Sequence, residues 1–401
     1  MPAAALPLLF LHRRYQPLHA TVGSVDVFAS DLAVAAVVVA AIVAVRLWGA
    51  APLRPARTLW LAAAAFLALL VVSCFWTPVE QLQTHVTTAV KIGEYALLAP
   101  ALCLLLRRRI DVDRFLLAFV AWSVCASTWG ALQFVGAVNE FEGKRPGQRE
   151  VSFLGIHDFA AFSAATLVIG LAALALGRRR RVALVSGAVG TALAASVFAF
   201  AGLVLAAVAI AVRARVTLRR AAAIAGVVVA VGAGVLALRS YDASNFFSFL
   251  GIEKSGAATT EDVQTGSQRT MLAYIGLRIW EDHPLLGVGF ERSADRYRPY
   301  LADAKRKFPR QPAQAYPSPQ HRWGVQNLWV QLLADVGVVG LVLGVATFLA
   351  GLVPALRTAN LVAAAWILVA AGTWNGVGIV AGIPLMALTW LGLGLSAVSF
   401  E

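Results

Sequence analysis

Long blocks of apolar residues alternate with short polar connections along most of this chain. Most blocks are about 15 to 25 residues long, close to the length that a helix needs to cross the hydrocarbon core of a bilayer. The pattern predicts an all-α, polytopic membrane protein with about eleven or twelve transmembrane helices and one large extracytoplasmic loop. Eleven spans can be placed, over residues 30–48, 58–76, 86–106, 114–137, 157–177, 182–197, 199–213, 221–239, 327–354, 359–377 and 382–399.

One apolar run, residues 182–212, is too long for a single ordinary span, and the charges indicate how it divides. Basic residues fall in alternate connections, as the positive-inside rule expects of short cytoplasmic loops. This alternation holds only if 182–212 crosses the membrane twice, as a tight hairpin. The basic groups are Arg54 and Arg57, residues 107–109, residues 178–181, four arginines between 213 and 220, and Arg357.

The same alternation divides the chain into three parts. Transmembrane helices occupy residues 1–239, a large extracytoplasmic loop occupies 240–326, and C-terminal transmembrane helices occupy 327–401. Within the loop, a broad apolar face predicts an interfacial helix from Thr270 to Trp280. Residues 241–268 lack strong periodicity, and we expect a loop there with room for one short helix.

Composition agrees with a membrane protein and changes the meaning of the charge. Of the 401 residues, 59% are hydrophobic and 14% are charged, and the mean hydropathy is +0.74. No soluble domain of this size has such values. The net charge of +13 would suggest nucleic acid in a soluble protein. Here Lys and Arg hold loops on the cytoplasmic side, so we expect membrane lipids and no nucleic acid as partners.

Cysteines and histidines indicate neither a disulfide framework nor a metal centre. Cys74, Cys103 and Cys125 lie inside apolar blocks and form no CxxC motif. None of the six histidines stands in a metal-ligand pattern such as HxxxH or HExxH. We therefore expect no metal and no cofactor.

Polar residues with chemical character gather in residues 266–345, around the start of the span at 327. A cationic shelf joined to a membrane helix suits an anionic lipid headgroup such as a pyrophosphate. The basic residues of this shelf are Arg292, Arg296, Arg298, Lys305, Arg306, Lys307 and Arg310. The motifs on either side are Arg269, Trp280, His283-Pro284, Gly287-Val288-Gly289, Gln326-Asn327-Leu328 and Asp335-Val-Gly337-Val-Val-Gly340.

In their order and spacing these motifs resemble the O-antigen ligase and polymerase superfamily. Its pattern is roughly an arginine, a helix, (D/E)HP-x-x-GxG and then HN-x-x-L-Q-x-x-x-E-x-G-x-x-G. The resemblance implies an inverting, metal-independent glycosyltransferase at the outer face of the bacterial cytoplasmic (inner) membrane. The donor would be a glycan linked to a polyprenyl pyrophosphate such as undecaprenyl pyrophosphate. The acceptor would be another glycan, a lipid A core or a protein, and the sequence does not distinguish these three.

The resemblance also assigns roles to individual residues. Arg269 corresponds to the essential arginine of the large loop, which holds the pyrophosphate. Gln326 stands where the family has its histidine, and glutamine cannot act as a base. Either His321, six residues before Asn327, is the general base, or the base is absent. Asn327 and Arg292 would contact the substrate.

Two further residues of the motifs are expected to act structurally. His283 would cap or orient the turn that Pro284 begins. Asp335 replaces a family glutamate, keeps the carboxylate, and would orient its helix against the large loop.

The loop at 138–156 ends in REVSFLGIHDFAAF, which loosely resembles the family's R-x-x-G-T-F-x-x-P-N-x-x-A. Arg149, with Arg145 nearby, would be a second cation that faces the pyrophosphate. The hairpin near Ser196 lacks the arginine of the family's Ser-Arg-Gly-Ala. Arg149 or Arg145 must therefore supply that charge, or the chain is a divergent or inactive member.

Two other functions fit the same pattern. A glycosyltransferase of a different fold would use a polyprenyl-phosphate sugar, an acidic residue such as Glu80 and a divalent metal, so a chelator would inhibit it. A transporter or flippase would move the same lipid-linked glycan without changing a covalent bond, and would carry more polar residues along its spans. Asp111-Val-Asp113 has the form of a metal–nucleotide-sugar signature, but its place in a tight cytoplasmic loop favours charge balance.

Overall fold

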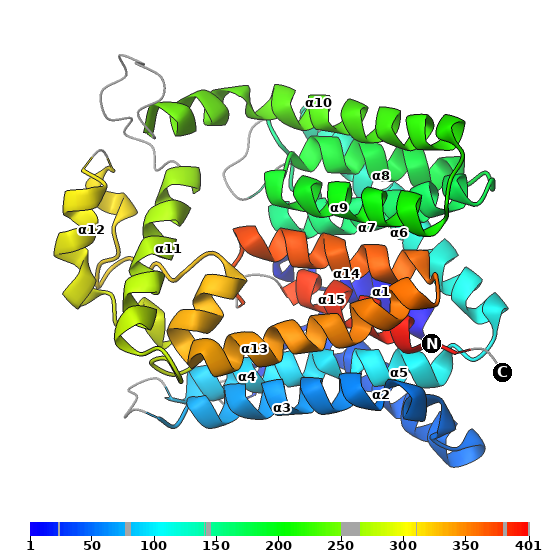
Figure 1. The fold of residues 1–401 in the computed structure, drawn as a ribbon, viewed down its shortest axis with the longest axis horizontal. Coiled ribbons are helices and arrows are strands. Elements are labelled where there is room, and N and C mark those ends of the chain that lie inside the picture. Colours follow the sequence, from blue (N-terminus) through cyan, green and yellow to red (C-terminus); the bar gives the residue numbers. More distant parts are fainter. Residues whose placement is uncertain are drawn as a thin grey trace.

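The fold is a bundle of apolar helices with a smaller group of helices at one end (Figure 1). The computed structural model describes residues 1–22, 25–76, 82–139, 141, 146–249, 265–309, 311–379 and 383–399. In these ranges seven helical segments are long and apolar enough to cross a membrane, and four apolar helices are shorter. The prediction of an all-α polytopic membrane protein is confirmed.

The long spans agree closely with the hydropathy blocks. They are α2 (Ala29–Trp48), α3 (Arg57–Ser73), α4 and α5 (Leu82–Ala96 and Leu98–Leu105), α6 (Arg109–Phe134), α7 (Ile156–Ala175), α10 (Leu218–Phe249) and α13 (Leu328–Arg357). The shorter apolar helices are α8 (Arg181–Ala194), α9 (Val197–Arg213), α14 (Leu361–Thr373) and α15 (Ile383–Ala397).

The core of the bundle is α7, which packs against α8, α9, α14 and α15. Its sequence has no polar face, and 94% of its most apolar window is buried inside the protein. Small residues permit this packing, because a side chain at Gly187 would overlap the backbone of Leu167. Because α7 is packed on all sides, the position of its first turn, which carries His157, is fixed within the bundle.

The apolar run 182–212 forms two helices, as the charge pattern predicts. The break lies at Ala195, whose φ of 45° ends α8, and Ser196 caps α9 by accepting a hydrogen bond from the amide of Ala199. The turn lies at the end of the bundle that carries α11 (Thr265–Asp282) and α12 (Leu301–Lys307) (Figure 1). This end is called the loop end below.

Two helices at the loop end are longer than predicted. Helix α10 continues to Phe249 instead of ending at residue 239, and α11 begins at Thr265. The apolar face of α11 forms, but it contacts protein instead of lipid. Met271, Leu272 and Ile279 pack into a separate core with residues of the loop that follows, including Tyr297 and Tyr316.

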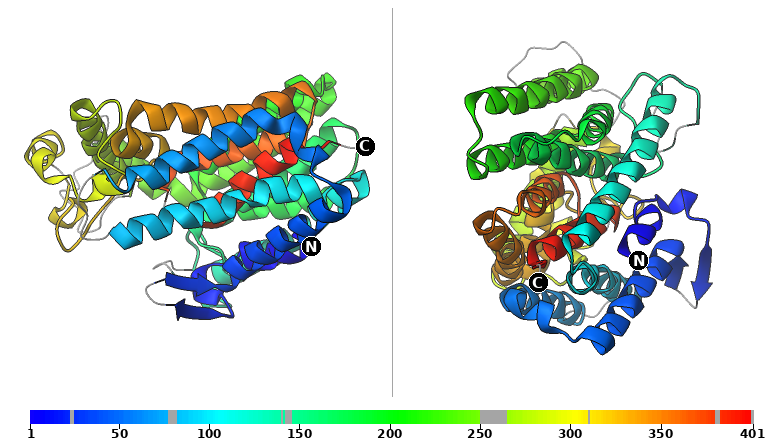
Figure 2. Two further views of the ribbon diagram at one scale, coloured as in Figure 1. Left: turned by 90° about the horizontal axis from the view of Figure 1, so that it is seen from below. Right: turned by 90° about the vertical axis from the view of Figure 1, so that its right-hand side faces the viewer.

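The N-terminal region adds small elements that hydropathy does not reveal. Helix α1 (Pro2–Leu9) packs on α2 and α6, and β1 (His19–Val22) pairs antiparallel with β2 (Val25–Phe28). The strands lie at the edge of the bundle (Figure 2). The amine of Lys91 on α4 donates to the Asp26 carbonyl at 2.7 Å and pairs with Asp31 at 2.9 Å, which ties β2 and α2 to α4.

Candidate functional site

Arg269 lies in the first turns of α11 and joins three segments that are far apart in the sequence. Its Nε donates to Oε1 of Gln326 at 2.9 Å, just before α13. One terminal nitrogen lies 2.9 Å from Nε2 of His157, at the start of α7. Because a guanidinium has only donors, this imidazole nitrogen must be the acceptor and carry no proton. Both of these partners of Arg269 are therefore uncharged.

Two more arginines approach Arg269 at the loop end. Burial, followed by the positive charges of Arg149 and Arg239, lowers the pKa of Arg269 to about 10. Arg269 still carries its charge at neutral pH. Arg239, near the end of the apolar part of α10, donates from Nε to the Ala195 carbonyl at 2.8 Å. Arg149, Arg239 and Arg269 are called the arginine cluster below.

Backbone contacts hold the loop that carries Arg149. The amide of Glu150 donates to the Leu193 carbonyl at 2.9 Å, which fastens this loop to the last turn of α8. The hydroxyl of Ser152 donates to the Ala126 carbonyl at 2.7 Å, which fastens it to α6. The loop, the α8–α9 turn and the start of α11 therefore meet at the arginine cluster. A cluster of partly buried cations is a favourable place for an anion.

Asp335 organises a second set of contacts, between the large loop and α13. Its buried carboxylate accepts hydrogen bonds from the amides of Glu291 and Ser293, at 3.0 and 2.9 Å, and from the side chain of Gln331 at 3.2 Å. The backbone of α13 breaks at Gly337, where φ is 66°. These contacts link the start of α13 to the large loop through Asp335.

The break in α13 frees backbone groups that the loop then satisfies. The amides of Val288 and Gly289 donate to the carbonyls of Ala334 and Asp335, at 3.0 and 2.7 Å. On the far side of Gly337, the amide of Val338 donates to the Pro284 carbonyl at 2.9 Å. This pairing fixes the end of α11, and therefore the direction in which the helix presents Arg269.

The large loop approaches α13 closely at Gly287, so a substitution there can test this contact through its effect on stability. This glycine has a φ of +64°, and a side chain there would overlap the carbonyl of Asp335. We expect Gly287→Ala to lower the free energy of unfolding by about 2–4 kcal/mol, through left-handed strain plus overpacking. Thermal unfolding in detergent measures this. Gly49→Ala is the control, because Gly49 has a φ of +78° but open space around it, so strain alone should cost about 1–2 kcal/mol. Equal losses in the two variants would contradict the close contact.

Residues 159–345 match the model of the O-antigen ligase family. This stretch is an O-antigen ligase domain. A search of curated proteins finds no match. The match confirms, for that stretch of the chain, the family recognised from the motifs, and with the apolar helices it supports an O-antigen ligase-like membrane enzyme family. Arg239, Arg269 and Gln326 lie inside the matched stretch, and His157 and Arg149 lie just before it.

The O-antigen ligase domain does not bring all the predicted site residues together. His321 is exposed; its ring stacks on Trp323, and its backbone bonds with Ser318. Arg292 lies beside the Asp335 contacts, with Asp295 4.0 Å away. Arg145 lies outside the described residues, as do Arg310 and Glu80.

Two other motif residues have structural contacts. Asn327 caps α13 by accepting from the Val330 amide at 3.1 Å, and its amide nitrogen donates to the Asn375 carbonyl at 3.1 Å. His283 follows the last residue of α11, and its carbonyl accepts from the Gly287 amide at 3.1 Å. This bond is made by the backbone, so the role expected for the His283 side chain stays a prediction.

His157 and Arg239 are the residues that the sequence interpretation missed. His157 belongs to the quoted GIHDF segment, where a polar residue opens a helix that is otherwise buried. Arg239 is a lone cation at the end of an apolar span, at a connection where the positive-inside rule predicts none. Neither feature of the sequence indicates that His157 and Arg239 lie close to the same arginine, Arg269. In the part of the chain that the structure describes, no three His, Cys, Asp or Glu side chains gather as metal ligands.

Proposed function

We propose that this protein is a membrane glycosyltransferase that transfers or polymerises a glycan carried on polyprenyl pyrophosphate. It would work at the outer face of the bacterial cytoplasmic membrane, where the loop end would lie. The observation that carries the proposal is the arginine cluster, in which the hydrogen bonds of partly buried Arg269 to described residues go to two uncharged partners, Gln326 and His157. An anionic headgroup would provide the charged acceptor that these partners do not.

The chemistry of the guanidinium supports a pyrophosphate ligand. Its planar fork matches two phosphate oxygens, and a pyrophosphate adds the attraction between opposite charges that the neutral partners Gln326 and His157 lack. Arg269 would therefore exchange Gln326 and His157 for the pyrophosphate. With Arg149 and Arg239 it would stabilise the charge that develops on the pyrophosphate as the sugar leaves. Fixed cations suffice for this role, so the proposed reaction requires no nucleotide and no metal.

The same exchange would prepare a base. When Arg269 turns to the pyrophosphate, the lone pair on Nε2 of His157 becomes available. It can then accept the proton of an acceptor hydroxyl. The hydroxyl oxygen attacks the anomeric carbon from the face opposite the pyrophosphate, and the bonding electrons leave with the pyrophosphate oxygen. His321, the base that the sequence resemblance implies, stays the alternative, but its exposed position beside Trp323 favours His157.

We assign to Arg239 the role of the arginine that the family has in the hairpin and that this chain lacks near Ser196. The family's arginine lies in the turn itself, whereas here the neighbouring helix α10 extends Arg239 to the carbonyl of Ala195 in that turn. Of the cations that the sequence offers for this role, Arg149 lies in the same cluster, so the two would share the pyrophosphate. On this proposal the chain is an active, divergent member of the family.

The role of Arg239 has a matched control on the same helix. Arg220, near the other end of α10, donates to the Ala175 carbonyl at 3.1 Å, so it makes the same kind of bond away from the cluster. We expect Arg239→Ala to reduce kcat/KM for glycan transfer by about 10²-fold and Arg220→Ala to change it less than about threefold. A transfer assay on both purified variants measures this. Equal effects would show that Arg239 only fastens α10 to the turn.

Transfer by the purified protein tests the function itself. The protein in liposomes is given a lipid-linked oligosaccharide donor and each acceptor class in turn, with excess chelator. Mass spectrometry follows the glycan. We expect a product with a new glycosidic linkage even when the chelator is present, and the mass of that product identifies the acceptor. Activity that the chelator abolishes would favour a metal-dependent transferase, and movement of the donor across the bilayer without a new linkage would favour a flippase.

A further inference from the structure

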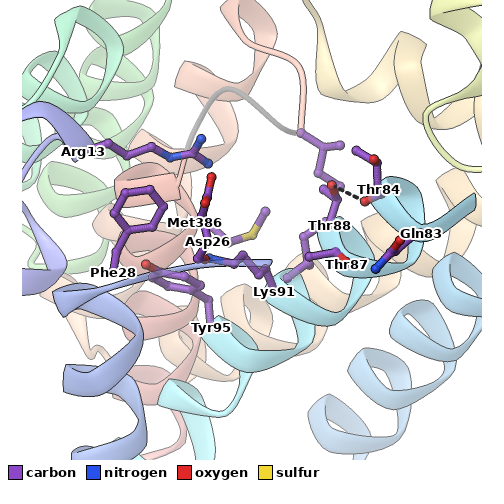
Figure 3. Close-up of a pocket in the computed structure, with 12 residues that line it drawn as sticks. Arg13, Asp26, Phe28, Gln83, Thr84, Thr87, Thr88, Lys91, Tyr95 and Met386 are labelled. Atoms are coloured by element: carbon purple, nitrogen blue, oxygen red, sulfur yellow. Dashed lines mark hydrogen bonds between the residues drawn. The ribbon is translucent and has the colours of Figure 1, made fainter. Parts of the chain in front are cut away.

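A second polar site lies on the other side of the start of α7, between β2, α4 and α15. It is a pocket of about 240 Å³, roughly the size of one sugar ring, and it is called the threonine pocket below. Thr84, Thr87, Thr88 and Lys91 stand at positions i, i+3, i+4 and i+7 of α4, so they share one face of that helix. This face turns into the pocket (Figure 3).

The lining combines hydroxyl groups with aromatic rings and a few charges. Each threonine hydroxyl has one donor and two acceptor positions, and that of Thr88 uses its donor on the Thr84 carbonyl at 3.0 Å, which leaves its acceptor positions for a ligand. Opposite this face are the guanidinium of Arg13, the carboxylate of Asp26 and the ring of Phe28 (Figure 3). A sugar presents hydroxyls that both donate and accept, together with apolar C–H faces, and this lining matches both.

Charge distinguishes the threonine pocket from the arginine cluster. Arg13 and Lys91 contribute positive charge, and Asp26 contributes negative charge. Lys91 is itself neutralised by Asp31 at 2.9 Å, outside the pocket lining. The pocket is therefore nearly neutral, which suits a sugar better than a pyrophosphate. The arginine cluster, which is positively charged, suits a pyrophosphate better than a sugar.

The two sites approach each other at the start of α7. A neighbouring hollow shares Arg13, Phe28, Lys91 and Tyr95 with the threonine pocket, and Asp158 also lines it. Asp158 follows His157 directly, and its carboxylate accepts from the Leu385 amide at 2.9 Å. One turn of α7 thus presents His157 to the arginine cluster and Asp158 to the side of the threonine pocket.

We propose that the threonine pocket binds a sugar residue of the acceptor, so that the acceptor is a carbohydrate. This inference rests on the proposed function, in which the arginine cluster holds the donor. An acceptor sugar held in the pocket would extend past the start of α7. Its reacting hydroxyl would then reach His157 from the side opposite the pyrophosphate.

The test separates binding of sugar from binding of pyrophosphate. Thr84, Thr87 and Thr88 are changed to valine, singly and together, because valine keeps the branched shape and removes the hydroxyl. Thr358→Val is the control, since the hydroxyl of Thr358, the residue that follows α13, also donates to the carbonyl four residues earlier, at 3.0 Å, and lies outside this pocket. The probes are core oligosaccharide and O-antigen repeat oligosaccharide from the producing bacterium, both free of lipid and pyrophosphate, and undecaprenyl pyrophosphate.

We expect each single variant to weaken oligosaccharide binding by about 3- to 10-fold and the triple variant by more than about 30-fold. Undecaprenyl pyrophosphate binding should stay within about twofold, and Thr358→Val should change neither. In the transfer assay the triple variant should raise KM for the acceptor and leave KM for the donor unchanged.

The outcomes distinguish this inference from the proposed function. If the wild type transfers glycan and the triple variant binds and uses the acceptor normally, the threonine pocket is not the acceptor site although the function stands. If the wild type transfers nothing but the triple variant loses oligosaccharide binding, the pocket is a sugar site although the function fails. Oligosaccharides that do not bind the wild type would overturn the assignment.

Discussion

Arg269→Ala is expected to reduce kcat/KM for glycan transfer by about 10²- to 10³-fold, the cost of removing one fixed donor from a developing anion. The reason is that Arg269 is a partly buried cation whose two uncharged hydrogen-bond partners can be exchanged for the pyrophosphate. Binding of undecaprenyl pyrophosphate should weaken in parallel. Arg269→Lys should recover only part of the activity, because an ammonium cannot present a planar fork to two oxygens.

Arg278→Ala provides the matched control for this prediction. Arg278 lies on the same helix, is about half exposed and forms an ion pair with Glu281, so it should tolerate truncation with less than a threefold change. Steady-state transfer kinetics and thermal unfolding of both variants separate catalysis from folding. If Arg269→Ala transfers glycan as fast as Arg278→Ala, the arginine cluster is not the donor site.

The membrane helices could be predicted because each is encoded in its own segment. Hydropathy needs only the local sequence, and the alternation of charged connections even located the turn between Ala194 and Val197. The method failed where polar residues continue a helix. Residues 240–249 are too polar for a hydropathy block, yet they extend α10 as far as Phe249. That extension lies directly beyond Arg239.

The candidate site was harder to predict because it depends on contacts between distant segments. The motifs identify Arg269, but not its contact with His157, which is more than one hundred residues earlier in the chain. Arg239 was missed for the same reason: the turn that it contacts belongs to two other helices. Sequence spacing favoured His321 because it lies near Asn327 along the chain. The fold exposes His321 on the loop instead.

His157→Gln is therefore the substitution that decides between the two candidate bases. Glutamine can still accept a hydrogen bond from Arg269, so the cluster should keep its shape, but it cannot take up a proton. We expect kcat to fall by about 10²- to 10⁴-fold, the usual contribution of a general base, while the affinity for undecaprenyl pyrophosphate stays within about threefold. Transfer kinetics and a separate donor-binding titration measure the two effects.

His321→Gln is the comparison, and it should leave kcat within about threefold if His157 is the base. The pH profile adds a second criterion, because a histidine base requires its neutral form and its removal should abolish the loss of kcat at acid pH. If His321→Gln abolishes transfer and His157→Gln does not, the loop at 318–323 must close over the arginine cluster when substrate binds. His157 would then only hold Arg269 in place until the pyrophosphate arrives.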